Sequence, residues 1–155
     1  MLLNLLPLDL ITYRGALALR FIDSVTGAAV TDNLRVRAWA YDPAAPRTLV
    51  AEDGDRIVGF VTTRPSPEVP SIGELMALYV DPPAWRGGHG RALIAAARAH
   101  LAARASTSAA LWLLAGNRRA EAFYLADGWR ADGARRHAEV WGVTVDELRM
   151  IRALP

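Results

Sequence analysis

Two short, almost wholly apolar runs constrain the fold of this chain more than any other feature. Residues 73–80 (GELMALYV) and 110–114 (ALWLL) are apolar on both alternating faces, apart from one glutamate. A strand with two apolar faces is buried on both sides and lies inside a sheet. Between these runs, residues 91–105 carry an apolar stripe at helical spacing, formed by Leu93, Ala97 and Leu101. The order of strand, helix and strand predicts a right-handed parallel crossover.

Antiparallel strands are predicted to precede this crossover. Residues 48–52 and 56–63 are rich in residues that favour strands, and they flank Asp53-Gly54-Asp55, a strong hairpin signal. A proline-rich loop over residues 64–70 then leads to the first apolar run. Residues 13–40 predict mostly helix, although the pattern is poor and Gly15 and Gly27 interrupt it.

The chain after the crossover predicts one more helix and two strands. Residues 118–126 form the helix, with Asn117 as its N-cap and Gly128 just beyond its end. Strands are predicted at 131–140 and 145–153, joined through Trp141-Gly142. We therefore expect residues 1–155 to form a single α/β domain with a mixed, mostly antiparallel sheet and one parallel crossover.

The composition excludes several kinds of chemistry. The 155 residues include no Cys and no Lys, so all 18 basic residues are Arg. Without Cys there is no thiol nucleophile or disulfide, and without Lys there is no Walker A loop or Schiff base. His89, His100 and His137 are scattered, which argues against a metal site. The formal net charge of +2 and the dispersed arginines argue against nucleic acid as a partner.

The first ten residues, MLLNLLPLDL, are apolar but lack a basic start and contain Pro7 and Asp9. Such a segment is too short to span a membrane and makes a poor signal peptide. We expect no membrane partner and a cytoplasmic location.

The turn between the first apolar run and its helix is a candidate binding site. It reads Trp85-Arg-Gly-Gly-His-Gly-Arg91. Glycines let a ligand approach the backbone, and the start of a helix offers free N–H groups to phosphate. Arg86 and Arg91 add positive charge. The competing interpretation is that the glycines only join a strand to a helix.

Two further residues are candidates for chemistry. The two-residue period of a strand places Glu74 on one face with Ile72, Met76, Leu78 and Val80, where a lone carboxylate is costly unless it is paired or solvated. Alternatively, the start of the strand is simply exposed to water.

Tyr124 follows Phe123 on the predicted second helix. It is either a core aromatic or a functional phenol.

Together these segments resemble the GNAT family of N-acetyltransferases over residues 47–153. That family has the loop Gln/Arg-x-x-Gly-x-Gly/Ala after a strand that ends in Val-Asp-Pro. Here Val80-Asp81-Pro82 leads to Trp85, Gly88 and Gly90, and Glu74 lies eleven residues before Trp85. Asn117, Tyr124 and Gly128-Trp129 are similar to a later Asn…Phe-Tyr…Gly-Phe/Trp element.

The resemblance implies a fold, a co-substrate and a set of site residues. The two parallel strands are expected to splay apart, and acetyl-CoA is expected to pair with the backbone of Leu78, Tyr79 and Val80 in the gap. No metal is implied. The remaining cofactor-binding residues that it implies are Arg86, Gly87, Gly88, His89, Gly90, Arg91, Asn117 and Tyr124.

The implied reaction is acetyl transfer to a primary amine of a small molecule or peptide. Glu74 would be the base, and Tyr124 would protonate or hydrogen-bond the departing sulfur. The alternative is that the protein is not an enzyme but a catalytically inactive acyl-CoA-binding or regulatory module. A homodimer is also possible by this resemblance.

Two departures from the family pattern stand out. Trp85 occupies the Gln/Arg position of the loop, and we expect its largely apolar side chain not to bind pyrophosphate. The region 1–40 is atypical or truncated, since only twelve residues precede Tyr13, which resembles the end of the family's first helix. We expect the first strand to be missing, to be replaced by residues 2–10, or to be lost to a misplaced start codon.

Overall fold

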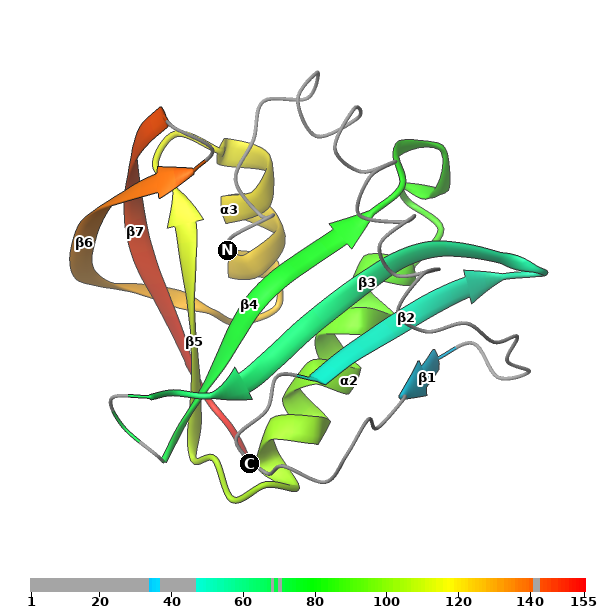
Figure 1. Ribbon diagram of the computed structural model, residues 1–155, viewed down its shortest axis with the longest axis horizontal. Helices are drawn as coiled ribbons and strands as arrows, with labels where there is room; N and C mark the ends of the chain where they lie inside the picture. Colours follow the sequence, from blue (N-terminus) through cyan, green and yellow to red (C-terminus); the bar gives the residue numbers. More distant parts are fainter. Residues whose placement is uncertain (1–33, 37–46, 68, 70, 141–142) are drawn as a thin grey trace.

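The computed structural model describes residues 34–36, 47–67, 69, 71–140 and 143–155. Within these residues it has seven strands and two α-helices (Figure 1). A 3-10 turn, η2 (Pro82–Ala84), follows the fourth strand. The main elements are β1 (Leu34–Val36), β2 (Arg47–Asp53), β3 (Arg56–Pro65), β4 (Ile72–Val80), α2 (His89–Ala102), β5 (Ser108–Leu114), α3 (Arg118–Ala126), β6 (Arg130–Val140) and β7 (Val143–Ala153).

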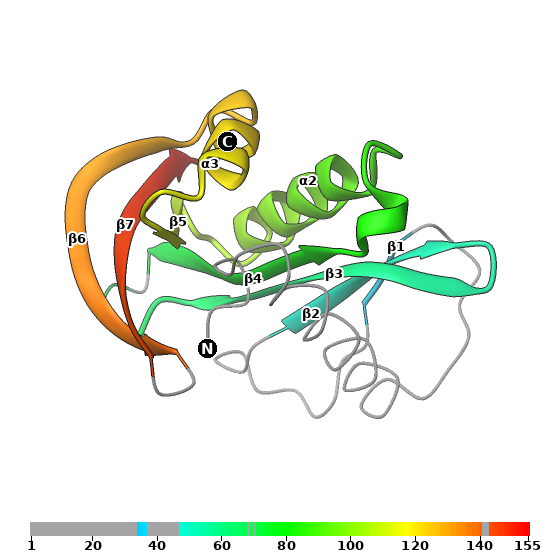
Figure 2. The same ribbon diagram turned by 90° about the horizontal axis from the view of Figure 1, so that it is seen from above.

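The strands form one sheet in the order β1-β2-β3-β4-β5-β7-β6. Among the described strand pairs, only β4–β5 is parallel, and α2 connects its two strands. All other described pairs are antiparallel. Both helices lie on the same face of the sheet, as Figure 2 shows. The predicted mixed α/β fold with one parallel crossover is confirmed.

The main core lies between the sheet and the two helices. Helix α2 turns Leu93, Ile94, Ala97 and Leu101 toward the strands, where each is almost fully buried. Burying one such aliphatic side chain stabilises the fold by roughly 1.5–3 kcal/mol. Gly73 lets this helix approach β4, because a Cβ there would lie 2.6 Å from Cδ2 of Leu101.

The predicted helix and hairpin signals match the structure closely. Helix α3 has the predicted bounds, and Oδ1 of its N-cap Asn117 accepts a hydrogen bond from the N–H of Ala120 at 3.2 Å. Gly128 follows its end with a φ of +89°. Helix α2 begins two residues earlier than predicted and ends three residues earlier, at Ala102. The connection at residues 141–142 lies outside the described residues.

The predicted helical character of residues 13–40 is wrong where it can be compared. Leu34–Val36 is strand β1, with Leu34 opposite Ala51 of β2. A three-residue strand depends on pairing with its neighbour rather than on its own pattern. The other residues of that segment, and the possible replacement of a first strand by residues 2–10, lie outside the described residues.

Strand β4 contains one extra residue, Met76, relative to β3. Thr62 lies opposite Ala77, whereas the next residue, Thr63, lies opposite Leu75. Met76 is therefore the bulged residue. Because of the extra residue, each side chain after the bulge lies on the opposite face of the sheet from the one that strict alternation would give it.

The bulge corrects the predicted position of Glu74. Its carboxylate pairs with Arg64 on the face away from the helices, which is also the face of Tyr79. Leu78 and Val80 instead pack against the core beneath α2. The prediction that Glu74 shares a face with Met76, Leu78 and Val80 is wrong, because a strict two-residue period does not hold across the bulge.

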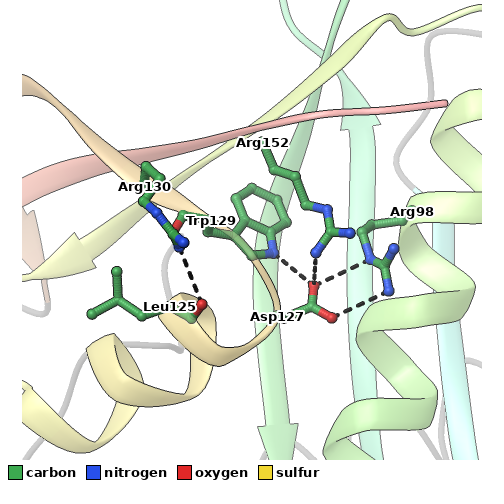
Figure 3. Close-up of polar contacts among 6 residues, drawn as sticks. All are labelled: Arg98, Leu125, Asp127, Trp129, Arg130 and Arg152. Carbon is green, nitrogen blue, oxygen red and sulfur yellow. Dashed lines mark hydrogen bonds and ion pairs between the residues drawn. The ribbon is translucent and has the colours of Figure 1, made fainter.

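The far end of α3 is tied to its neighbours through one carboxylate, Asp127 (Figure 3). Oδ2 of Asp127 lies 3.1 Å from Nε of Arg98 on α2 and 3.2 Å from Nη1 of Arg152 on β7. The indole N–H of Trp129 donates to the same oxygen at 2.9 Å. Arg130 adds a bond from Nη1 to the carbonyl of Leu125 at 3.2 Å. These contacts hold α3 against α2 and the sheet.

Candidate active site

The two parallel strands separate soon after they pair. Only Ile72–Glu74 of β4 pairs with Ser108–Ala110 of β5. Beyond this point β4 continues to Val80 and β5 to Leu114, and the strands diverge, as Figure 1 shows. The backbone of β4 toward Val80 thus lacks a β5 partner among the described pairs, which confirms the splayed central pair.

A cavity of about 630 Å³ opens beside this splayed part of β4. Its wall combines the end of β4, the loop after it, the first turn of α2, and α3 as far as Tyr124. The lining residues are Leu78, Tyr79, Val80, Ala84, Trp85, Arg86, Gly88, Gly90, Arg91, Asn117, Arg119, Ala120, Phe123 and Tyr124.

The loop before α2 has the backbone shape that its glycines allow. Gly88 caps the helix with a φ of +87°, a left-handed conformation in which only glycine is free of strain. Arg86 also has a positive φ, +65°, which is uncommon for a residue with a side chain. The first N–H groups of a helix have no partner within the helix, and they carry partial positive charge. They lie at the cavity, since Gly90 and Arg91 are in its wall.

Three arginines contribute to the wall: Arg86, Arg91 and Arg119. No carboxylate is among the described lining residues. Nor does any ion pair join these arginines to a carboxylate in the part of the chain that the structure describes. The cavity therefore has an uncompensated positive charge, and it suits an anionic ligand.

Sequence reasoning missed Arg119. It lies on a different element from the glycine loop, and its side chain stacks on Trp85, with Cζ 3.9 Å from the ring centroid. The indole N–H of Trp85 is donated to the carbonyl of Val80 at 2.7 Å. The only signal in the sequence was the pair Arg118-Arg119 directly after the predicted N-cap.

Helix α3 brings its aromatic pair to the opposite wall. Tyr124 is 1% exposed and contacts the rings of Phe123 and Trp129 edge to face, at centroid distances of 5.3 and 6.0 Å. Phe123 approaches the start of α2, because a Cβ on Gly90 would lie 3.4 Å from its Cε2. The start of α2 and the side of α3 that carries Phe123 thus meet at the cavity.

The structure leaves three of the predicted site residues outside the described cavity wall. Gly87 and His89 adjoin it, and the His89 ring folds back within about 3.0 Å of the position of a Cβ on Gly87. Glu74 lies at the point where the strands begin to separate, but on the sheet face away from α2 and α3. Tyr124 belongs to the helix side.

The carboxylate of Glu74 is held in place by Arg64. Nε of Arg64 donates to Oε2 of Glu74 at 2.7 Å, and the Glu74 side chain is only 14% exposed. Of the outcomes expected for Glu74, the structure gives the paired carboxylate rather than one simply exposed to water. On the same face, β5 presents Trp112, with the guanidinium of Arg136 stacked 4.1 Å from its ring centroid.

Tyr79 differs from Tyr124 although both are among the lining residues. Its ring packs against Phe60 on the other face, at a centroid distance of 6.1 Å, so it meets the cavity through its backbone. Burial, with a smaller contribution from Asp81, raises the pKa of Tyr79 to about 12. Its phenol stays neutral at ordinary pH and is a poor proton donor.

No three His, Asp or Glu side chains come together among the described residues as possible ligands of a metal ion. No helix in that part of the chain has the length and apolar character needed to cross a membrane.

Solved structures with a fold similar to that of this chain include acetyltransferases. A ribosomal-protein-alanine N-acetyltransferase from Brucella melitensis superposes with a TM-score of 0.60 at 27% identity, covering 70% of this chain and 69% of that one. The ribosomal-protein-S18-alanine N-acetyltransferase from Escherichia coli has the same TM-score at 21% identity, covering 77% and 81% of the two chains. The second likeness shows the fold alone.

Sequence comparison gives the same family. A mycothiol acetyltransferase from Kocuria rhizophila is 37% identical over 103 residues, which are 62% of this chain and 34% of that protein. The chain therefore spans about a third of that relative's length. The profile of the acetyltransferase (GNAT) family matches residues 20–129, most of the chain. With the splayed parallel pair, the glycine loop and this match, the chain belongs to the acetyltransferase (GNAT) family.

Proposed function

We propose that this protein transfers the acetyl group of acetyl-CoA to a primary amine of a small molecule or peptide. The observation that carries the proposal is the positively charged cavity beside the splayed part of β4. It combines the β4 backbone beyond its pairs with β5, a helix start and three arginines, a donor set suited to a long ligand with an amide arm and phosphates.

The donor set fits acetyl-CoA in two parts. The backbone of Leu78–Val80 would pair with the amide arm, as an added strand would. The N–H groups of the loop and helix start, from Arg86 to Arg91, would hold the pyrophosphate. Gly88 and Gly90 keep this approach free of side chains. Asn117 holds the start of α3, and so it supports the wall opposite.

Acetyl-CoA, when bound, supplies an activated acetyl thioester. An alkylamine has a pKa near 10.4, so it must lose a proton before it attacks at neutral pH. Glu74 is the carboxylate nearest to the point where the strands separate, and we assign it as the base, acting through water. Tyr124, on the other side of the sheet, donates its phenolic hydrogen toward the departing sulfur.

The names of the relatives support acetyl transfer, but the acceptors in those names differ from one relative to another. One is named for mycothiol and another for an alanine of ribosomal proteins. The acceptor side of this chain is the sheet face that carries Glu74, Trp112 and Arg136. A small molecule or a peptide amine remains the proposed class.

The first experiment separates an enzyme from an inactive binding module. Acetyl-CoA binding is measured by calorimetry, and release of free CoA thiol is followed with a broad panel of amines and peptides. Binding with turnover on at least one amine supports the proposal. Binding with no turnover across the panel favours the inactive acyl-CoA-binding module, and no binding contradicts both.

The second experiment tests the base. Glu74→Gln keeps an oxygen that accepts from Arg64 but cannot take a proton, so turnover at pH 7 should fall about 10²-fold or more. The deficit should shrink toward pH 10, where the amine loses its proton without help. Glu52→Gln, at the far end of β2, is the matched control and should leave turnover unchanged. A Glu74→Gln enzyme with wild-type turnover at pH 7 removes the assignment.

Tyr124→Phe tests the proposed donor to sulfur. Turnover should fall at every pH, because the phenolic hydrogen acts on the leaving group, while the apparent affinity for the acceptor stays nearly unchanged. A loss confined to acceptor affinity would instead make Tyr124 a binding residue.

A further inference from the structure

Arg119 is the feature of the cavity that neither the glycine loop nor the strand backbone accounts for. It lies in the first turn of α3, lines the cavity and is exposed. No described carboxylate forms an ion pair with it. Arg118, the preceding residue, is also exposed but is not part of the cavity wall. Of these two neighbouring arginines, only one is directed to the cavity.

Trp85 provides a fixed surface beneath Arg119. Its indole N–H donates to the carbonyl of Val80 at 2.7 Å, which ties the ring to the end of β4. The guanidinium carbon of Arg119 lies 3.9 Å from the ring centroid. This is a cation–π contact, and it joins α3 to the loop before α2.

Stacking of this kind leaves the guanidinium free to bind. A guanidinium has five N–H donors that lie in its plane, whereas the ring contact uses its face. The in-plane edge is thus available to an anion, and the contact limits the side chain's freedom before the ligand arrives. Arginine is well suited to phosphate because two parallel N–H groups match two phosphate oxygens.

We propose that Arg119, held by stacking on Trp85, binds a phosphate group of the CoA ligand, and that Trp85 is the positioning residue for this contact. The inference rests on the proposed function. It also explains the departure in the loop. Trp85 stands where the resemblance expects Gln or Arg, and the cationic side chain comes from α3 instead.

The test uses the full chain and two probes, CoA and pantetheine, which lacks the phosphates. Affinity for CoA is measured by calorimetry and affinity for pantetheine by ligand-observed NMR. Arg119→Ala should weaken CoA binding about tenfold and leave pantetheine binding unchanged, since only CoA carries the phosphates. Arg118→Ala, the matched control with the same loss of charge, should change neither affinity by more than about twofold.

Variants of Trp85 test the positioning role. Trp85→Ala should weaken CoA binding about as much as Arg119→Ala. The double variant should bind little worse than either single variant, because both changes remove one contact. Trp85→Phe keeps a ring for stacking and should retain affinity within about threefold of wild type. Melting temperatures check that each variant is folded.

The outcomes separate this inference from the function on which it rests. A wild-type protein that does not bind CoA removes the proposed function. If wild type binds CoA but Arg119→Ala binds equally well, the contact is wrong and the function stands. If the losses of the two single variants add up in the double variant, Trp85 does not position Arg119.

Discussion

Helices α2 and α3 meet in two places, and arginine has a different role in each. Where both helices start, Arg91 and Arg119 face the cavity without a described carboxylate partner. Farther along, Arg98 of α2 pairs with Asp127 at the end of α3, and Arg152 of β7 joins them (Figure 3). Asp127 offsets one of the two positive charges of Arg98 and Arg152, and this group serves the fold. The arginines at the cavity have no such partner among the described residues, and their positive charge suits an anionic ligand.

The difference shows what a single residue type can mean in a chain without lysine. Every basic side chain here is an arginine, so composition does not separate structural from ligand-binding cations. The side chain of Asp127 is 16% exposed, and its ion pairs with Arg98 and Arg152 are what give these two arginines a structural role.

The largest expected effect is on stability, from Asp127→Ala. The change leaves Arg98 and Arg152 facing each other without a carboxylate and removes the acceptor of the Trp129 indole. The free energy of unfolding should fall by roughly 2–4 kcal/mol. Urea unfolding measures it.

A matched control for that change is Asp146→Ala. Its carboxylate pairs with His137 but is 66% exposed, so less than about 1 kcal/mol should be lost. Equal losses in the two variants would show that Asp127 does not have a special place in the fold.

The next largest effect is on the affinity for CoA, and it is expected from Gly90→Val. Valine adds carbon atoms beside Phe123 and at the helix start where phosphate must approach. CoA affinity should fall more than about tenfold, whereas stability should change by about 1 kcal/mol or less. Gly90→Ala adds only the Cβ, 3.4 Å from Cε2 of Phe123, and should cost less affinity. Calorimetry on both variants decides this, and wild-type affinity in Gly90→Val removes the loop from the CoA site.

A smaller effect is expected from Arg86→Ala and Arg91→Ala. Each removes one uncompensated charge from the cavity, so CoA affinity should fall about three- to tenfold at low salt. The deficit should shrink in 1 M salt, where screening acts over about 3 Å. Unfolding free energies should stay within about 0.5 kcal/mol of wild type. A larger loss of stability than of affinity would place these arginines with the structural group.

The smallest effect concerns His100, near the end of α2. Burial, and then the positive charges of Arg104 and Arg47, lower its pKa from the ordinary value. The unfolded chain therefore binds a proton more readily, and stability falls as the pH drops through the ordinary histidine value near 6.5. His100→Gln should lose less stability between pH 7 and pH 5 than wild type does. Parallel curves for the two proteins would contradict this.

Most of the secondary structure after residue 47 could be predicted because its signals are local. The helix over residues 118–126 was delimited by Asn117 and Gly128, whose roles depend only on the backbone beside them. The Asp53-Gly54-Asp55 turn predicted the β2–β3 hairpin, and Gly54 has a φ of +60°. The parallel crossover followed from two apolar runs around one helix.

The candidate site could be predicted only in part. The glycine loop, the end of β4 and Tyr124 were found, and the structure gathers residues of all three around one cavity. Arg119 was not found, because its contact with Trp85 joins residues from separate elements and has no local pattern. Strand β1 was missed for a similar reason, since its pairing with β2 creates it.

The sequence by itself determined the order of elements, the helix ends and the glycine turn, since caps, turns and periodic apolar positions act over a few residues. The tertiary structure alone decided on which face each functional side chain lies. The bulge at Met76 separates Glu74 from Leu78 and Val80, and it forms only when β4 pairs with β3. Likewise, Asp127 made two arginines structural because folding brought Arg98 and Arg152 to it from distant parts of the chain. Pairing register and charge compensation are properties of the assembled sheet and helices, so no local pattern contains them.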